Sequence, residues 1–303
     1  MKRREIRGGL ILVLLALAST EMGRPCVGAE VAGDQSRRAE AFHLYSMAQQ
    51  SLLGRDYAEA LTLMEQAAAQ DDSPGLLLEL AQLRFSLNDL DRAAALAERI
   101  VAADPKQVEA HKLLGDIYLS RGREGSDPEA NLARAVDQLR AALEGDPADE
   151  EACRSLAEIY YRTGRLDETA VLLQTFARGR PLDQAMSLLL GKADLRTGRY
   201  AEAEAILTGI VARSPGNLEA VDALAALFEY QKKYDESIAL YAGLVRHGSA
   251  TAYLQDRIGS LHLLAGRYRD AIRELEEGQR LDPDDTRGLL ALAQAYEGAG
   301  DTA

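Results

Sequence analysis

The side chains best suited to chemistry near neutral pH, histidine and cysteine, are few in this chain of 303 residues. Its histidines are His43, His111, His247 and His262. No His-Glu-x-x-His zinc motif, Gly-x-x-x-x-Gly-Lys phosphate loop or Gly-x-Ser-x-Gly nucleophile motif occurs. His111, His262 and Cys153 fall on the apolar sides of predicted helices, which is typical of buried structural residues. The sequence therefore predicts that the chain is not an enzyme and holds no metal and no cofactor.

Carboxylates are the commonest charged groups, with 48 Asp and Glu against 35 Lys and Arg and a formal net charge of −13. Such an acidic chain disfavours nucleic acid and anionic membranes as partners. The run Asp-Pro-Asp-Asp at 282–285 lacks the glycine and the distant glutamate of an EF-hand calcium loop. Acidic residues also gather just before apolar helical segments, where the positive end of a helix dipole favours them. Function is therefore expected in a binding surface and not in a reactive centre.

The first residues have the pattern of a secretory signal peptide. Residues 1–7 are basic, residues 8–19 are apolar, and the small residues Val-Gly-Ala at 27–29 form a cleavage site. The apolar segment is shorter than the ~20 residues that a spanning helix needs. We predict a signal peptide over residues 1–29 and a short linker over 30–40, with no integral membrane span in the mature chain. An exported protein, periplasmic or secreted, follows from this; an uncleaved N-terminal anchor is the alternative.

The rest of the chain repeats with a period of 34 residues. A small residue follows an apolar one in the first helix of each unit, at intervals of 33, 34 and 42 and then four of 34. Apolar residues at helical spacing predict two helices in each unit. A turn such as Leu-Ala-Gly-Arg-Tyr-Arg-Asp-Ala at 264–271 joins the two helices, and a proline usually ends the second. The small residues are Ala48, Ala81, Gly115, Ala157, Gly191, Ala225, Gly259 and Ala293.

This pattern resembles the tetratricopeptide repeat, a 34-residue helix–turn–helix family. The resemblance implies an all-α fold, a right-handed superhelical solenoid of antiparallel helix pairs over residues 41–303, with seven pairs and a final half repeat. The eight additional residues of repeat three fall near 122–131 and are expected to form a loop or a slightly extended turn between its two helices. The residues of repeat seven that carry the resemblance are Ile258, Gly259, Gly266, Tyr268, Ala271, Leu275 and Pro283.

The last predicted helix, residues 286–298, has no second helix after it. It is expected to pack through Leu289, Leu292, Ala293 and Tyr296. Either the sequence stops within an incomplete repeat, or this helix is a lone cap over repeat seven.

In this family, side chains from the first helices line a concave groove. Mapping those positions onto this chain places a basic cluster in mid-groove beside an acidic end. Our hypothesis is that Arg154, Arg162, Lys192 and Arg196 hold an acidic segment or a terminal carboxylate, with Tyr161 adding apolar contact. The alternative is that these residues form a solvated helix face. The candidate peptide-binding residues are Lys112, Asp116, Arg154, Glu158, Tyr161, Arg162, Lys192, Arg196, Asp222 and Tyr230, joined by Glu229 and Asp256.

Two functions remain open at this point. The first is an exported scaffold or adaptor that binds a protein or peptide segment in its groove. The second is the periplasmic repeat arm of a larger envelope-biogenesis or polysaccharide-export protein or machine. The sequence leaves the oligomeric state open, and it does not name the partner.

Overall fold

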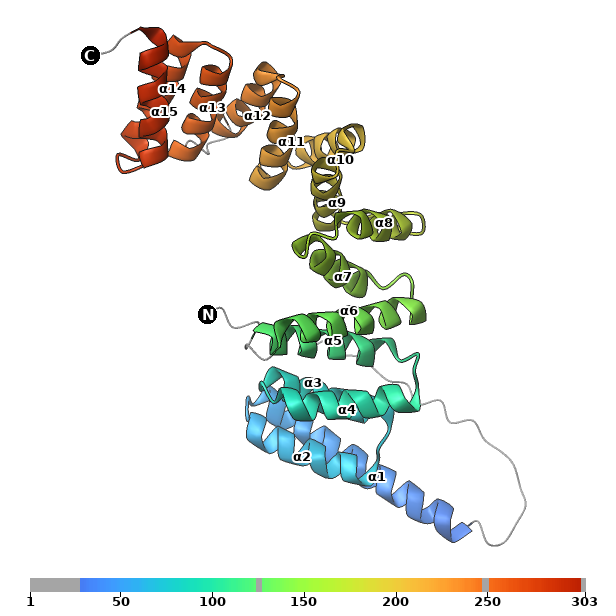
Figure 1. Cartoon of the computed structure of the whole chain (residues 1–303). Coiled ribbons are helices and arrows are strands. Elements are labelled where there is room, and N and C mark those ends of the chain that lie inside the picture. The colour runs from blue at the N-terminus through green and yellow to red at the C-terminus, as the bar shows by residue number, and fades with distance from the viewer. Residues whose placement is uncertain (1–27, 124–126, 247–250, 301–303) are drawn as a thin grey trace. The chain divides into compact units, whose positions relative to one another are not determined.

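The computed structural model describes residues 28–123, 127–246 and 251–300, with side chains described from residue 35 onward. Fifteen α-helices and no strand occur in these ranges (Figure 1). The predicted all-α helical repeat fold is therefore confirmed. The helices are α1 Gly28–Leu53, α2 Tyr57–Gln70, α3 Pro74–Ser86, α4 Leu90–Ala103, α5 Val108–Arg123, α6 Pro128–Gly145, α7 Glu150–Arg162, α8 Leu166–Ala177, α9 Gln184–Arg196, α10 Tyr200–Arg213, α11 Leu218–Tyr230, α12 Tyr234–Arg246, α13 Ala252–Leu264, α14 Tyr268–Leu281 and α15 Thr286–Ala299.

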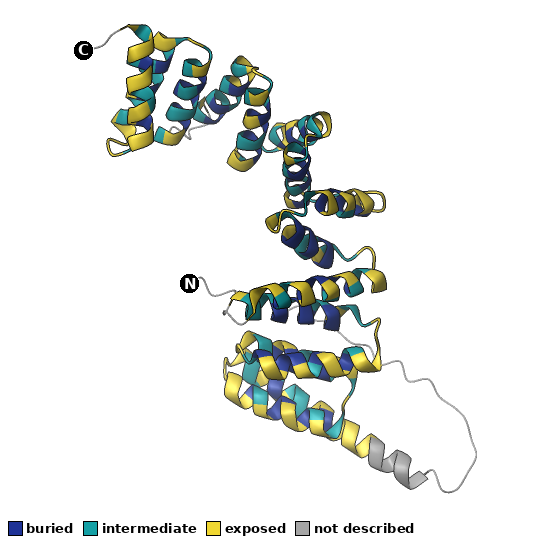
Figure 2. Ribbon diagram, viewed as in Figure 1, coloured by how far each residue is buried: buried dark blue, intermediate teal, exposed yellow. Residues whose placement is uncertain are grey.

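The chain divides into two compact units, residues 1–80 and 81–303. In the first unit, α1 packs against α2. In the second unit, each helix from α4 to α15 packs against the next, and the short turns between them make neighbouring helices antiparallel. The first helices of successive pairs also touch, α7 with α9 and α9 with α11. Buried residues therefore run along the facing sides of these helices, and exposed residues cover their outer sides (Figure 2).

Small residues lie where the two helices of a pair cross, as the repeat predicted. A Cβ atom added to Gly191 would lie 3.0 Å from Leu207 Cδ2 on the second helix of its pair. A Cβ added to Gly259 would lie only 2.5 Å from Leu275 Cγ. Larger side chains at these positions would push the helices apart, because protein interiors are close-packed.

The turns within pairs need a left-handed residue. Gly164, Gly198 and Gly266 have φ angles of 76°, 81° and 72°. Glycine adopts this conformation without a Cβ penalty, and Gly266 lies in the turn that the sequence predicted at 264–271. Lys232 stands in the same place after α11 with a φ of 59°, so repeat six holds a strained L-residue in its turn.

A regular row of capping residues begins the first helices α7, α9, α11, α13 and α15. Each side chain accepts a hydrogen bond from the backbone N–H of the residue three positions later, at 2.7–3.4 Å. Caps of this kind each contribute about 1 kcal/mol. The row is Asp149, Asp183, Asn217, Thr251 and Asp285, again at intervals of 34.

The predicted packing face of the last helix is partly wrong. Leu292 packs onto the cluster of Leu275 and Ala295, but Leu289 and Ala293 are exposed. In earlier pairs this side of the first helix is covered by the second helix of the same pair. No second helix follows α15 among the described residues, so its small residue at position 293 stays exposed.

Most of the residues at 122–131, where a loop or an extended turn was expected, belong to the two helices of repeat three. Within 122–131, Gly122 and Arg123 belong to α5, and residues 128–131 belong to α6. Asp127 caps α6 by accepting a hydrogen bond from the N–H of Ala130 at 3.3 Å. The remaining residues, 124–126, lie outside the described ranges.

The predicted signal peptide also lies outside the described residues, except for its last two positions, and it stays a prediction. Helix α1 begins at Gly28, so residues 30–40, expected to be a linker, are helical. None of the described helices is both long and apolar enough to cross a membrane.

Candidate functional site

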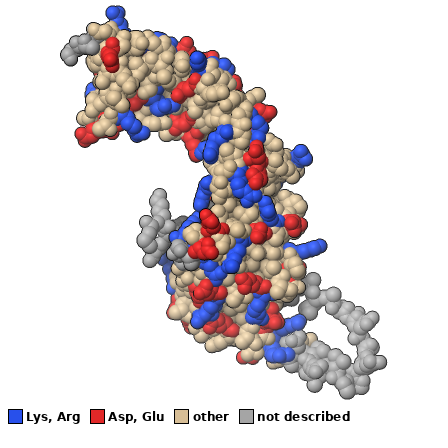
Figure 3. Space-filling model, in the orientation of Figure 1, with Lys and Arg blue, Asp and Glu red and all other residues tan. Residues whose placement is uncertain are grey.

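The candidate site consists of side chains on α5, α7, α9, α11 and α13, which are all first helices of pairs in the second unit. Basic and acidic side chains are intermixed over the face that Figure 3 shows. The question for each charged residue is therefore whether the fold already neutralises it.

Lys112 already forms ion pairs between neighbouring repeats. Its Nζ lies 3.1 Å from Asp149, the residue that caps α7, and 2.7 Å from Glu151 in the first turn of that helix. Only 13% of its side chain is exposed. Burial alone would lower the pKa of Lys112, but the hydrogen bonds with Glu151 and Asp149 outweigh it and hold the pKa above its usual range. Lys112 therefore ties α5 to α7 and is not an available ligand for a partner.

Arg154 makes the same tie one repeat later. Its guanidinium lies 2.6 Å from Glu150 and 2.8 Å from Asp183, the residue that caps α9. Lys192 also has a partner, because its Nζ lies 2.5 Å from Glu219 at the start of α11. Two of the four cations in the hypothetical cluster are thus already paired across repeats.

Lys192 and Arg196 both lie close to the ring of Tyr161. The Nζ of Lys192 lies 5.4 Å from the centre of its ring, and the Cζ of Arg196 lies 5.3 Å from it. These are cation–π distances. Arg162 and Arg196 are exposed, and neither has a carboxylate partner within the ranges that the structure describes. The structure therefore leaves two exposed guanidinium groups without a carboxylate partner among the described residues, and that of Arg196 lies beside the ring of Tyr161. Exposed Glu158 lies one turn before Arg162.

The carboxylates of Asp222 and Glu229, at the predicted acidic end, are already bound by neighbouring side chains. Asp222 accepts hydrogen bonds from the hydroxyls of Tyr241 at 2.9 Å and Tyr253 at 2.8 Å. Glu229 is bound by Arg257. Outside this end, in repeat three, Asp116 is half-buried on α5.

A tyrosine remains exposed at that end. Tyr230 is 67% exposed and stacks against Tyr200, with ring centres 4.7 Å apart and an angle of 37° between the rings.

Asp256 occupies the repeat position of Lys112 and Arg154 but faces another acid, Asp285, which caps α15. Both Asp256 oxygens are inaccessible to solvent, and when ionised they have no hydrogen-bond donor among the described residues. Burial first, and then the hydrogen bond with Asp285 and the charges of Asp285 and Asp282, together raise the pKa of Asp256 to about 7, while Arg287 opposes the rise. In its protonated form, Asp256 can donate a hydrogen bond to Asp285.

Asp256 is also closely packed. Its carboxyl group lies close to Gly278 and Gly288. A Cβ atom added at either glycine would lie 3.0 Å or less from Asp256 Oδ1. Sequence reasoning listed Asp256 as a groove residue and missed this acid pair. Comparing each capping residue with the residue 29 positions before it would have found the pair, since Asp183 and Arg154 have the same spacing.

The histidine and cysteine predictions are consistent with structural roles. His111 is buried, and its ring nitrogens lie 2.7 Å from Gln138 Oε1 and 3.0 Å from the carbonyl oxygen of Pro105. Cys153 is fully buried, and burial, followed by Asp149 and Glu150, raises the pKa of its thiol to about 12. Over the described ranges, no three His, Cys, Asp or Glu residues are grouped so as to hold a metal ion.

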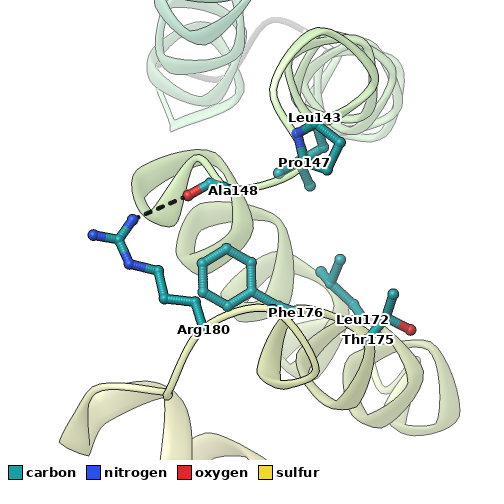
Figure 4. Close-up of a pocket in the computed structure, with 8 residues that line it drawn as sticks. Leu143, Pro147, Ala148, Leu172, Thr175, Phe176 and Arg180 are labelled. Carbon is teal, nitrogen blue, oxygen red and sulfur yellow. Dashed lines mark hydrogen bonds between the residues drawn. The ribbon is translucent and has the colours of Figure 1, made fainter.

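A pocket of about 380 Å³ that the sequence did not predict lies between α6 and α8 (Figure 4). It forms where α8 ends early: Ala177 is four residues before Pro181, whereas α6 ends two residues before Pro147. Arg180 stands at its edge and donates a hydrogen bond to the carbonyl oxygen of Ala148 at 3.3 Å. The lining residues are Leu143, Pro147, Ala148, Leu172, Thr175, Phe176, Gly179 and Arg180.

Comparison with known proteins agrees with this architecture. Sequence models described as tetratricopeptide repeat match residues 52–122 and residues 129–173, 169–217 and 257–303. A stretch of 256 residues, 82% of this chain, is 25% identical to the Superkiller complex protein 3 of Mus musculus. This chain spans 16% of the length of that relative.

Solved structures show the same fold. The C-terminal part of a TPR repeat-containing protein from Cytophaga hutchinsonii matches with a TM-score of 0.64 and 17% identity, over 82% of this chain and 99% of that one. YrrB, described as a TPR protein with an unusual peptide-binding site, matches with a TM-score of 0.50 and 16% identity, over 75% of this chain and 96% of that one.

Proposed function

We propose that this chain, which belongs to the tetratricopeptide repeat family, is a scaffold that binds a segment of a partner protein on its first helices. Proteins with this repeat generally serve as scaffolds for protein–protein interaction. The observation that carries the proposal for this chain is the group of Tyr161, Lys192 and Arg196, with exposed Arg162 following Tyr161 at the end of α7. The description of YrrB, a protein of the same fold, as having a peptide-binding site supports it further.

The partner segment is acidic under this proposal. Arg162 and Arg196 are exposed and have no carboxylate partner among the described residues, so each can bind a carboxylate of a partner protein. A hydrogen bond to a charged group contributes roughly 1.5–3 kcal/mol, and arginine can form two such bonds in parallel to one carboxylate. Arg154 is left out of the binding site because Glu150 and Asp183 already neutralise it.

Under this proposal the scaffold is exported and is periplasmic or secreted. The support is the basic and then apolar pattern of residues 1–29. The alternative is a repeat arm within a larger envelope-biogenesis or polysaccharide-export protein. Its support is that the Superkiller relative is much longer than the stretch that this chain matches. Fractionating cells that express the chain, followed by N-terminal sequencing, tests export: a new N-terminus at Glu30 supports it, and an intact N-terminus in the cytoplasm contradicts it.

Capture of partners by the full chain tests the scaffold function. The informative variant is Arg162→Glu with Arg196→Glu, because both side chains are exposed and neither forms an ion pair between repeats among the described residues. The matched control is Arg178→Glu with Arg269→Glu, two exposed arginines outside the first helices. Circular dichroism should show unchanged helix content in both variants.

We expect the first variant alone to lose partners that cross-link to α7 and α9, and we expect added salt to weaken capture of the same partners by the unsubstituted chain. If both double variants capture the same partners at the same strength, the first-helix arginines are ordinary surface residues and the proposal is wrong.

A further inference from the structure

Four first helices end in residues that form a row along the second unit. The last residues of α7, α9, α11 and α13 are Arg162, Arg196, Tyr230 and Leu264, which recur at intervals of 34. All four are exposed, Tyr230 by 67% and Leu264 by 58%. We call these four residues the C-terminal row.

The fold explains only half of this row. Arginine at the end of a helix interacts favourably with the negative end of the helix dipole, so Arg162 and Arg196 have a structural reason to be there. No such reason accounts for an exposed tyrosine and an exposed leucine at the same repeat position. Ser86, which ends α3 at the equivalent position, shows that the repeat does not need an apolar residue there.

Two members of the row are held in place by neighbouring rings. The guanidinium carbon of Arg196 lies 5.3 Å from the ring centre of Tyr161, and the ring of Tyr230 stacks on Tyr200 at 4.7 Å. Side chains that are already ordered lose less conformational entropy when a ligand binds. Both positions are therefore suited to recognition.

The spacing of the row sets the spacing of its ligand. Neighbouring packed helices lie roughly 8–10 Å apart, and an extended peptide advances about 3.3 Å per residue. One repeat therefore corresponds to about three residues of an extended segment.

From this match we propose that the C-terminal row reads an extended partner segment with two acidic residues followed or preceded by two large apolar residues, each three positions from the next. The acidic residues bind Arg162 and Arg196, and the apolar residues cover Tyr230 and Leu264. This inference rests on the proposed function, since both use the first helices, and it adds the sequence pattern of the partner.

The test uses the full chain and three labelled decapeptides of one composition, measured by fluorescence anisotropy. The first has two glutamates and then two leucines at three-residue spacing, with serine and glycine elsewhere. The second has the same pattern in the opposite direction, and the third has the glutamates and leucines scrambled. We expect one of the two patterned peptides to bind at least tenfold more tightly than the scrambled peptide.

Substitutions then assign each half of the pattern. We expect Arg196→Glu and Leu264→Ser each to weaken binding of the preferred peptide about tenfold. The matched controls are Arg178→Glu and Val171→Ser, which change an exposed arginine and a 63% exposed valine outside the row and should leave the affinity unchanged.

The outcomes separate this inference from the proposed function. Equal binding of patterned and scrambled peptides, with loss on Arg196→Glu but not on Leu264→Ser, keeps the acidic-segment proposal and overturns the pattern. If no peptide binds in a way that depends on Arg196 or Leu264, both the pattern and the proposed function are overturned.

Discussion

Replacing Asp256 with asparagine should remove a pH-dependent weakness in the last helix pair. The substitution keeps the shape of the side chain, which matters because Gly278 and Gly288 leave no room for a larger one. The neutral amide can donate a hydrogen bond to Asp285 at every pH, as protonated Asp256 does only at low pH. The variant therefore imitates the protonated form permanently.

The sign of the effect follows from the direction of the pKa shifts. The pKa of Asp256 is raised from 3.8 in the unfolded chain to about 7 in the folded one, so the folded state binds the proton more tightly. Its contribution to the free energy of unfolding is therefore lost as pH rises from about 4 to about 7. The pKa of Asp285 is lowered by the hydrogen bond from Asp256, and its own contribution is lost only as pH falls through that lower pKa.

The magnitude is smaller than the shift alone suggests. A rise of about three pKa units converts to roughly 4 kcal/mol. Asp256 is only half-buried as a residue, and the opposite shift of Asp285 offsets part of the effect. We expect Asp256→Asn to be more stable than the unsubstituted chain by about 1–2 kcal/mol at pH 8 and by almost nothing at pH 5.

Thermal unfolding between pH 5 and pH 8 measures this difference, and hydrogen exchange locates it in α13 and α15. The control is Asp284→Asn, which removes an exposed carboxylate from the loop between α14 and α15 that holds Asp285. Parallel pH profiles for Asp256→Asn and the unsubstituted chain, or a less stable variant at pH 8, would refute the reasoning.

Three further predictions concern the helix pairs. Lys232→Gly should raise the free energy of unfolding by about 0.5–1 kcal/mol in urea titrations, because glycine relieves the left-handed turn at φ 59°; an unchanged midpoint contradicts this. Gly259→Ala should lower stability by about 1–3 kcal/mol, since the added Cβ would meet Leu275, whereas Gly209→Ala in open space should raise it slightly; equal melting temperatures for the two variants contradict the packing reasoning. Cys153 should resist a thiol reagent in the folded chain and react on unfolding, as mass spectrometry of its peptide would show; rapid labelling of native protein would mean that the thiol is accessible.

The sequence predicted those features that the backbone imposes within one repeat. The glycine at 259 could be placed because a close helix crossing excludes larger residues, and Gly266 because its turn needs a positive φ. The packing face of α15 could not be predicted in the same way. Exposure of Leu289 depends on whether another helix covers it, and periodicity does not reveal that neighbour.

Charge pairing was the other feature beyond the reach of the repeat pattern. The family positions correctly directed attention to Tyr161 and Arg196, which the structure brings within 5.3 Å of each other. They did not show that Lys192 and Arg154 have carboxylate partners, because those partners lie 27 to 29 residues away in the next repeat. An ion pair of this kind depends on side-chain geometry across the stack.

The two ends of the first helices therefore have different roles. Near the N-terminal ends, Lys112 and Arg154 each bind the residue that caps the next first helix, and Asp256 meets such a cap without a compensating charge. These side chains hold repeats together, and changing them would alter stability before it altered binding. At the C-terminal ends, Arg162 and Arg196 are exposed and bind no carboxylate in the part of the chain that the structure describes. Substitutions that test partner binding without breaking an ion pair between repeats therefore belong at the C-terminal ends of these helices.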